Sequence, residues 1–233
     1  MNISLCTVIM NRTEFTKGPY QSWVSFPFQE IVIVDWSSDV PIRTYLPKDT
    51  SFGHRVRIVE VRGKKRFDIN KARNLAIRNT SGAFVMLVDQ DVGLCNHFFR
   101  STHIDIDKLY RGGYPNGTGT TGTCLFFRKW FYKVNGYHEG MCGAGGGDND
   151  FYERCQRAGA ELKSFNRNVV FHYPHNRNLG TKGYDIKDIK KSCSNNTLLA
   201  KEKPWTSRNK ISQHDFTIYH RSRSGVFREV SIS

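Results

Sequence analysis

The feature that most constrains the fold is an apolar run that ends in two carboxylates, Phe84-Val85-Met86-Leu87-Val88-Asp89-Gln90-Asp91. An apolar run of this length is typical of a buried strand in a largely parallel sheet. α/β proteins bind ligands at the carboxyl edge of such a sheet, where Asp89 and Asp91 would lie. Carboxylates there need a cationic partner, and a hard divalent cation that also contacts substrate phosphates is the natural one. The segment therefore predicts a metal-dependent enzyme acting on a phosphate-bearing substrate; the alternative is a plain strand-to-loop turn.

The rest of the chain supports an α/β fold. Strands are expected at residues 3–10, 30–35, 56–61, 83–88, 123–127, 169–172 and 215–220. Helices are expected from Asp68 to about 78, over 129–134 and from Asp148 to about Arg157, while 18–29 is irregular with a short helix. This alternation predicts a mostly parallel, doubly wound sheet with helices on both faces, and 233 residues suffice for a single core.

The formal net charge of +14 implies a polyanionic partner or surface, unless it is simply a solvated basic exterior. Donor phosphates would need only a few of these charges. The basic residues form two clusters. The first cluster contains Arg55, Arg57, Arg62, Lys64, Lys65, Arg66, Lys71 and Arg73. The second cluster contains Lys182, Lys187, Lys190, Lys191, Lys201, Lys203, Arg208 and Lys210.

Cysteine usage and hydropathy predict a cytoplasmic protein. The six cysteines include no C-x-x-C pair, which argues against a zinc site and for reduced thiols, although an even count leaves disulfides open. No segment approaches the roughly 18 apolar residues needed to span a bilayer. The apolar N-terminus lacks a basic region and a cleavage site, so we expect a first strand there and not a signal peptide.

A second carboxylate group follows a glycine run, Gly143-Ala144-Gly145-Gly146-Gly147, as Asp148-Asn149-Asp150. The glycines would let a ligand approach the backbone closely. Asp148 would lie at a helix N-terminus, which favours its ionised form and suits a general base. The alternative is that Asp148 only caps the helix.

Three further side chains are candidates for the same site. His172 ends a strand and is a candidate metal ligand beside Asp91, although a lone strand-end histidine is more often structural. His175 competes for the same role. Arg73 could pair with a diphosphate or with Asp89, or be a solvated helix residue.

The order of these motifs resembles the family 2 glycosyltransferases of GT-A fold. The matching stretches are the first strand with Asn11-Arg12, Val34-Asp35-Trp36-Ser37-Ser38-Asp39, Lys71-Ala72-Arg73-Asn74 and Val88-Asp89-Gln90-Asp91. The later stretch from Asn135-Gly136-Tyr137-His138-Glu139-Gly140 to Gly145-Gly146-Gly147-Asp148-Asn149-Asp150 is similar to the galactosyltransferase C-terminal signature. The resemblance covers roughly residues 1–175 in the right order, which is more specific than any single motif.

The resemblance implies a role for each matching residue. Thr7 and Asp35 would contact the nucleotide base, with Asn11, Arg12 and Gln90 also on the donor side. Arg73 would lie near the diphosphate, Asp89 near the ribose and phosphates, and Asp91 would hold Mn²⁺ or Mg²⁺ with His172. Asp148 would deprotonate the acceptor, next to an acceptor lining of Gly145, Gly146, Gly147 and Asp150. Two positions depart from the pattern. Trp36 stands where the family has an aspartate. Gly147 stands where the family has a glutamate that normally helps to hold the acceptor or donor sugar. The identity of the donor and acceptor is therefore less safely inferred from the family.

We therefore expect a metal-dependent, inverting hexosyl- or pentosyltransferase that uses a nucleotide-sugar, a UDP-sugar by preference. Residues 1–192 would form the GT-A domain, with a nucleotide-binding half over 1–95 and an acceptor half over 96–192. Residues 193–233 would be a basic extension packed on that domain. The expected acceptor is polyanionic: either DNA with a hydroxylated base, of phage type, or a cell-surface or viral glycan assembled at an anionic membrane. The protein itself is expected in the cytoplasm, which is that of the host cell if the protein is viral. The alternative is a non-catalytic nucleotide- or glycan-binding module of the same fold.

Overall fold

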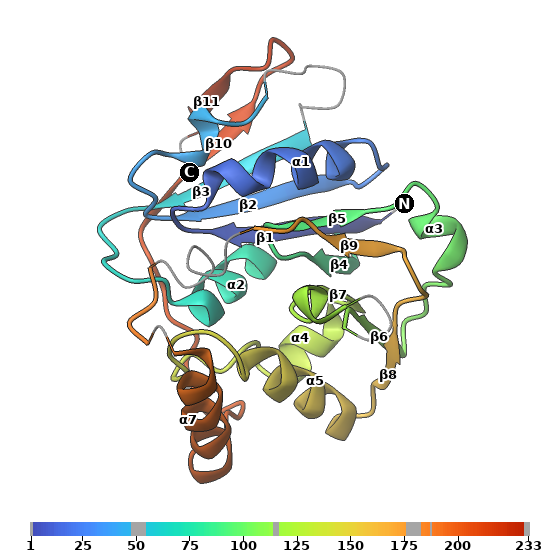
Figure 1. Ribbon diagram of the computed structural model, residues 1–233, viewed down its shortest axis with the longest axis vertical. Helices are drawn as coiled ribbons and strands as arrows, with labels where there is room; N and C mark the ends of the chain where they lie inside the picture. Colours follow the sequence, from blue (N-terminus) through green and yellow to red (C-terminus); the bar gives the residue numbers. More distant parts are fainter. Residues whose placement is uncertain (1, 48–54, 114–116, 176–182, 187, 231–233) are drawn as a thin grey trace.

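The computed structural model describes residues 2–47, 55–113, 117–175, 183–186 and 188–230. A nine-stranded sheet runs through the molecule in the order β11-β10-β3-β2-β1-β4-β7-β6-β8 (Figure 1). Its strands are β1 (Ile3–Ile9), β2 (Glu30–Trp36), β3 (Val56–Val61), β4 (Phe84–Leu87), β6 (Lys108–Arg111), β7 (Cys124–Phe127), β8 (Glu161–Ser164), β10 (Phe216–Arg221) and β11 (Phe227–Val230). β5 (Val92–Leu94) pairs with β9 (Val170–His172) in a separate two-stranded sheet.

The centre of the large sheet is parallel and its flanks are mixed. β1 pairs in parallel with β2 on one side and β4 on the other, and β2 pairs in parallel with β3. β7 is antiparallel to β4, and β10 is antiparallel to β3. The chain thus reverses its direction of winding at β1, so the carboxyl ends of β1 and β4 form the crevice where α/β proteins bind ligands. The predicted α/β class is confirmed.

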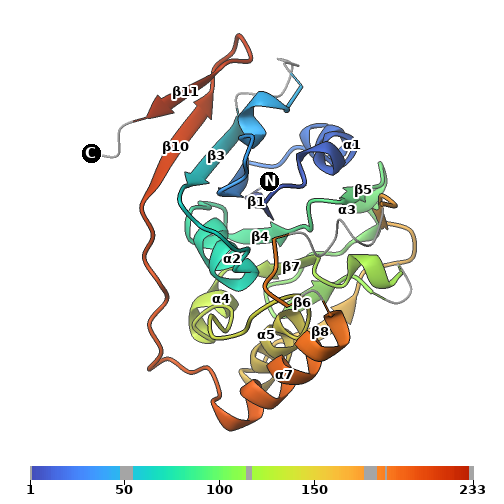
Figure 2. The ribbon, with the colours of Figure 1, turned by 60° about the vertical axis from the view of Figure 1, so that its left-hand side comes forward.

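Helices cover both faces of this sheet (Figure 2). They are α1 (Thr13–Val24), α2 (Ile69–Arg78), α3 (Phe98–Ser101), α4 (Lys129–Lys133), α5 (Gly147–Arg157) and α7 (Ile189–Glu202), with short 3-10 turns at Ile42–Thr44 and Thr118–Thr120. Alternate residues of β1 face opposite sides, as strand geometry requires. Cys6 packs in the core that contains α2, whereas Leu5 packs in the core that contains Trp23 of α1.

Several elements differ from the sequence expectation. The irregular segment before β2 contains the twelve-residue helix α1, which tolerates Pro19 in its interior. Short strands such as β5 and β8 were not expected, because three or four residues are too few to show a period. The expected boundary at 192/193 falls inside α7. β10 and β11 then extend the central sheet beside β3.

The state of the cysteines and the character of the helices can be compared with the sequence expectation. All six cysteines are free thiols, so the disulfides that the even count left open are not formed. Within the described ranges, no helix combines the length and apolar character needed to cross a bilayer.

Candidate functional site

A cavity of about 240 Å³ opens at the carboxyl ends of β1 and β4. It collects ten of the candidate residues named from the sequence: Arg12, Arg73, Asp89, Gln90, Asp91, Gly145, Gly147, Asp148, His172 and His175. Its remaining lining residues are Ile69, Asn70, Gly119, Gly143, Ala144, Tyr184 and Asn196. The cavity therefore joins the two carboxylate motifs, which lie far apart in the sequence.

Arg73 connects these two motifs. Its guanidinium donates to Oδ1 of Asp148 at 2.5 Å and to Oδ1 of Asp89 at 3.0 Å. The Arg73 side chain is only 4% exposed, so it is a buried cation between two carboxylates and not the solvated helix residue that was one alternative. Arg73 lies on α2, from where its side chain reaches both the end of β4 and the first turn of α5.

Burial and this pairing act on the pKa values in opposite directions. Burial raises the pKa of Asp89 to about 6, although Arg73 pulls it down. Burial also raises the pKa of Asp148, again against Arg73. Burial alone would lower the pKa of Arg73, but Asp148 and Asp89 keep it well above its usual value. The expectation that the helix start alone keeps Asp148 ionised is therefore incomplete, because burial opposes it.

Asp148 lies in the first turn of α5, and the N-cap residue is Gly146. The capping alternative for Asp148 is thus not what the structure shows, since its carboxylate pairs with Arg73 of another helix. A carboxylate with a raised pKa at the wall of a cavity can accept a proton.

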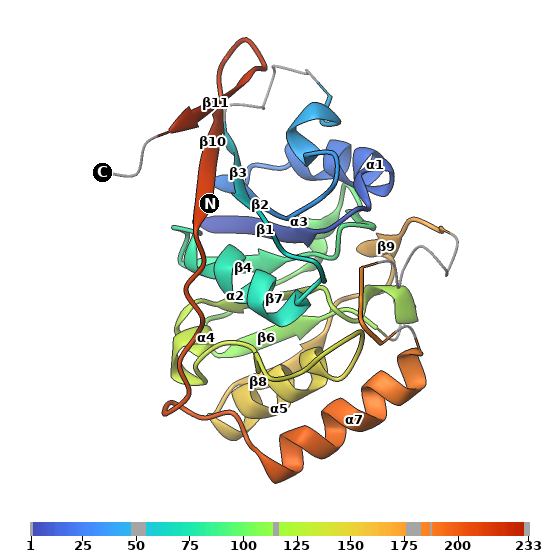
Figure 3. The ribbon, with the colours of Figure 1, turned by 90° about the vertical axis from the view of Figure 1, so that its left-hand side faces the viewer.

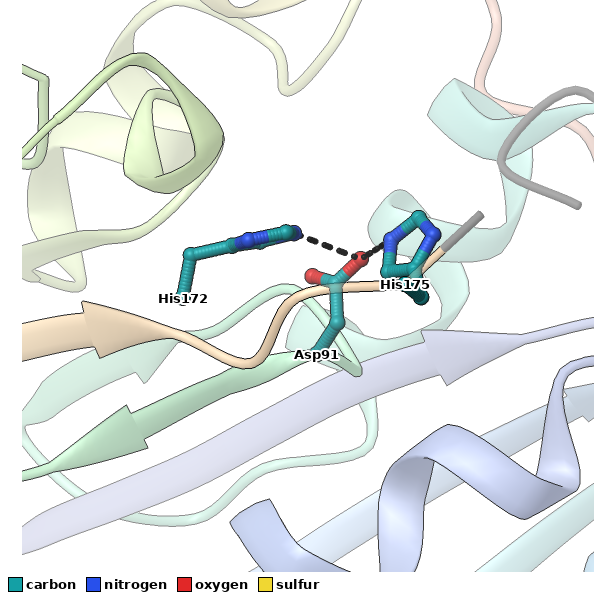
Figure 4. Close-up of side chains that lie close together, drawn as sticks. All are labelled: Asp91, His172 and His175. Carbon is teal, nitrogen blue, oxygen red and sulfur yellow. Dashed lines mark hydrogen bonds and ion pairs between the residues drawn. The ribbon is translucent and has the colours of Figure 1, made fainter. Parts of the chain in front are cut away.

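Asp91 forms the second centre of the cavity together with two histidines (Figure 4). Its Oδ2 lies 2.7 Å from Nε2 of His175 and 3.5 Å from Nε2 of His172. One ligand atom of each residue lies within 4.8 Å of the others. The sequence left open whether His172 or His175 lies beside Asp91, and the structure places both rings next to this carboxylate.

Another part of the cavity wall is built around Arg12, which follows β1. Its guanidinium lies beside two aromatic rings, 5.6 Å from the ring centroid of Phe67 and 5.3 Å from that of Tyr184. The two rings are stacked on each other with centroids 5.4 Å apart. Gln90 connects Arg12 to β1. Its amide nitrogen donates to the Val8 carbonyl at 3.2 Å, and its amide oxygen accepts from Arg12 at 2.9 Å.

Five predicted residues do not line this cavity. Asp35 is 1% exposed and accepts from the backbone N–H groups of Ser38 and Ile42, so it fixes the loop after β2. Asn11, at φ 56°, accepts from the backbone N–H of Asp39 in the same loop. Thr7 is fully buried, and its Oγ1 has no partner within the described part of the chain.

The other two face a different hollow. Gly146 and Asp150 line a second cavity of about 760 Å³ between α5 and α7. Asp150 pairs there with Arg154 at 2.6 Å, one turn further along α5. Asn196 of α7 lines both cavities, so the two hollows share a wall.

The first part of the galactosyltransferase-like signature is held by side-chain hydrogen bonds to backbone groups. Asn74 of α2 accepts from the Tyr137 N–H at 2.7 Å and donates to Glu139 at 2.8 Å. Glu139 in turn accepts from the backbone N–H of Ser212 in the tail at 2.8 Å. The signature loop is therefore a junction between α2 and the C-terminal segment.

Sequence reasoning missed three side chains of the site. Asn70 donates to the His138 carbonyl, and its buried Oδ1 has no partner among the described residues. Tyr184 and Asn196 come from the segment after residue 175, which showed no motif. Asn70 could have been found from its place one turn before Arg73 on the expected helix, but nothing local marks the other two.

Comparisons with known proteins agree with this geometry. A family model described as the N-terminal domain of galactosyltransferase matches residues 100–176. The catalytic domain of a Drosophila β1,4-galactosyltransferase 7, solved with xylobiose, superposes with a TM-score of 0.62 at 15% identity, over 91% of this chain and 83% of that one. No curated protein sequence matches the chain significantly.

More distant structures share the same fold. A mannosyltransferase from Pyrobaculum calidifontis, in complex with GDP-Man and Mn²⁺, gives a TM-score of 0.56 at 13% identity, over 72% of this chain and 55% of that one. TarS of S. aureus with UDP-GlcNAc gives 0.55 at 14% identity, over 76% and 59%. The chain therefore shares the GT-A fold of these glycosyltransferases, and residues 100–176 match the galactosyltransferase family model.

Proposed function

We propose that the chain transfers a sugar from a UDP-sugar to an acceptor hydroxyl in a reaction that needs a divalent cation and inverts the anomeric centre. The observation that carries this proposal is the single cavity that joins the Asp91–His172–His175 group to the Asp89–Arg73–Asp148 array. Among the similar structures, a Drosophila galactosyltransferase mutant was solved with manganese, UDP-Gal and xylobiose, which supports this choice of donor.

The residues present fit a divalent cation. Asp91 offers a carboxylate oxygen, and His172 and His175 offer imidazole nitrogens within 4.8 Å of it. Mg²⁺ prefers an all-oxygen octahedral shell, whereas imidazole ligands suit transition metals better. We therefore favour Mn²⁺ over Mg²⁺. When bound, the cation would neutralise the charge of the leaving nucleoside diphosphate.

The chain's own side chains would supply the other functions. Arg12 places a cation at the donor side of the cavity, where it can bind phosphate oxygens. Arg73 occupies Oδ1 of Asp148, and we assign the proton of the acceptor hydroxyl to Oδ2. The acceptor oxygen then bonds to the anomeric carbon while the bond to the diphosphate breaks on the opposite face. Alignment of the two reactants in one cavity would contribute a large part of the acceleration.

The acceptor that we propose is polyanionic. The described lysines of the second basic cluster on α7 and just after it are exposed, and one of them, Lys201, lines the second cavity. DNA carrying a hydroxylated base and an anionic glycan at a cell or viral surface both fit such a rim. The free cysteines support a reducing compartment, the cytoplasm, as the site of action.

A donor screen tests the enzymatic part of this proposal. Released UDP is measured with UDP-Gal, UDP-Glc and UDP-GlcNAc, in Mn²⁺, in Mg²⁺ and in excess chelator. We expect release with at least one donor in Mn²⁺ and none in chelator. Asp91→Asn should nearly abolish turnover and weaken Mn²⁺ binding followed by electron paramagnetic resonance. Asp107→Asn, at a carboxylate that is 69% exposed, is the matched control. Full turnover in chelator would refute the metal requirement.

A further inference from the structure

The glycine run before Asp148 is in contact with a helix that the sequence did not predict. Gly143, Gly145 and Gly146 have φ values of 72°, 87° and 85°, which only glycine adopts readily. A Cβ atom on Gly145 would lie 2.2 Å from Sγ of Cys193, and one on Gly146 would lie 2.8 Å from Cβ of Asn196. The glycines therefore let α7 approach the loop closely. From the sequence, we expected a ligand to make this close approach.

Asn196 holds this loop by its backbone. Its amide nitrogen donates to the carbonyls of Cys142 at 3.0 Å and Gly145 at 2.8 Å, and its oxygen accepts from the N–H of Cys142 at 3.1 Å. The hydroxyl of Ser192, one turn earlier, donates to the Cys142 carbonyl at 2.9 Å. Asn196 is 3% exposed, so these bonds are largely shielded from bulk water, which strengthens them.

The loop leads without a break into the functional carboxylate. Gly147 is the first residue of α5 and Asp148 the second. A Cβ on Gly147 would lie 2.5 Å from Oδ1 of Asn70, so the loop is confined from the α2 side as well. Figure 3 shows α7 lying alongside α5. A shift of the loop would therefore move Asp148 relative to Arg73 and to the cavity.

We infer that Asn196 is a positioning residue: through the backbone of residues 142–145 it fixes the place of Asp148, so that the segment after the galactosyltransferase-like match sets the geometry of the proposed base. This inference rests on the proposed function. It assigns a positioning role to α7, which lies beyond residue 176, where the family match ends. Asn196 acts through the loop and does not itself take part in proton transfer.

The test compares two variants of Asn196 with a neighbour on the same helix. Asn196→Ala removes all three bonds. Asn196→Asp keeps the shape and the acceptor oxygen but replaces the donor nitrogen by an oxygen that faces two carbonyls. Asn195→Ala, at an exposed position, is the matched control. The measurements are kcat and KM for the donor from UDP release in Mn²⁺, and hydrogen exchange of residues 140–147.

We expect both Asn196 variants to lose roughly 10- to 100-fold in kcat, the scale of a small misplacement of a catalytic group. KM for the donor should stay within about 2-fold, and the Asp variant should be no better than the Ala variant. Exchange of the loop should speed up in both, and the control should match the wild type. Ser192→Ala, which removes one bond, gives a milder form of the same effect if the Asn196 variants do not fold.

Two results would overturn the inference. A raised donor KM with unchanged kcat would make Asn196 a substrate contact. Unchanged kcat together with unchanged loop exchange would show that α7 does not hold the loop. If the wild type releases UDP from no donor, the proposed function fails, whereas the exchange measurement still decides whether Asn196 fixes the loop.

Discussion

Replacement of Arg73 by methionine should destabilise the protein more than the loss of any surface ion pair. The change leaves the carboxylates of Asp89 and Asp148, 22% and 18% exposed, without the buried cation between them. Removal of one partner from a buried ion pair typically costs about 3–5 kcal/mol. For a chain of this length that corresponds to a fall in Tm of about 6–20 °C.

The deficit should depend on pH in a defined direction. Burial already raises the pKa of Asp89 to about 6 and raises that of Asp148, and Arg73 is what opposes both shifts. Without Arg73 both pKa values should rise further above the unfolded value of about 3.9. A carboxyl group with a raised folded-state pKa stabilises the fold at low pH and loses that contribution as the pH rises through the folded pKa. The deficit of Arg73→Met relative to wild type should therefore shrink between pH 7.5 and pH 5.

Urea unfolding of the metal-free protein at these two pH values measures both effects. Arg157→Met is the control, because its ion pair with Glu153 is 73% and 61% exposed and should contribute at most about 0.5 kcal/mol. If Arg73→Met destabilises no more than this control, or if its deficit grows at pH 5, the account of a buried cation between two carboxylates is wrong.

Three further predictions concern turnover and ligands. Asp148→Asn should lower kcat by roughly 10²–10⁴-fold and leave donor affinity unchanged; lost donor affinity with normal turnover would make Asp148 a binding residue. A general base works only when deprotonated, and burial raises the pKa of Asp148. As the solution is acidified, kcat should therefore begin to fall at a pH above the usual aspartate pKa of about 3.9. A kcat that stays constant down to that pH would contradict this. Binding to duplex DNA should weaken linearly in log affinity against log salt, with a slope of roughly −0.9 per phosphate contacted, and a flat response would leave an anionic glycan or membrane as the polyanion. The slope should flatten, with donor hydrolysis unaffected, when four lysines are neutralised together: Lys190, Lys191, Lys201 and Lys203.

The sequence was informative wherever a periodic segment ended in a functional residue. The β4 run could be assigned because its apolar residues are continuous, and its end therefore located Asp89 and Asp91 at the sheet edge. The helix from Asp68 could be assigned from its apolar face, which put Arg73 within reach of that edge. Buried strands and amphipathic helices leave local patterns, so these parts of the site were predictable.

Residues that act through tertiary contacts left no such pattern. Asn196 has a role only because α7 packs on the glycine run, and a polar helix of mixed composition gives no sign of what it packs on. Asp35 showed the reverse case: a strand-end carboxylate looked like a ligand contact, but the chain turns back so that Ser38 and Ile42 supply its hydrogen bonds. Spacing identifies candidate residues, and the loop path decides which of them face a cavity.

The distribution of charge shows why the salt prediction is directed at the tail. Six residues of the first basic cluster bond to protein oxygens: Arg55, Arg57, Arg62, Arg66, Lys71 and Arg73. Neutralising the buried Arg73 would disturb the fold, whereas Arg62 and Arg66 are 68% and 49% exposed and their ion pairs contribute little to stability. In the second cluster, Lys182 and Lys187 lie outside the described residues. The other six are exposed and make no ion pair within the described part of the chain. Exposed cations without an ion pair are the most accessible to a phosphate or sulfate. Among the described residues the second cluster has six of them and the first cluster has Lys65, so we expect the contact with a polyanion on α7 and the segment that follows it.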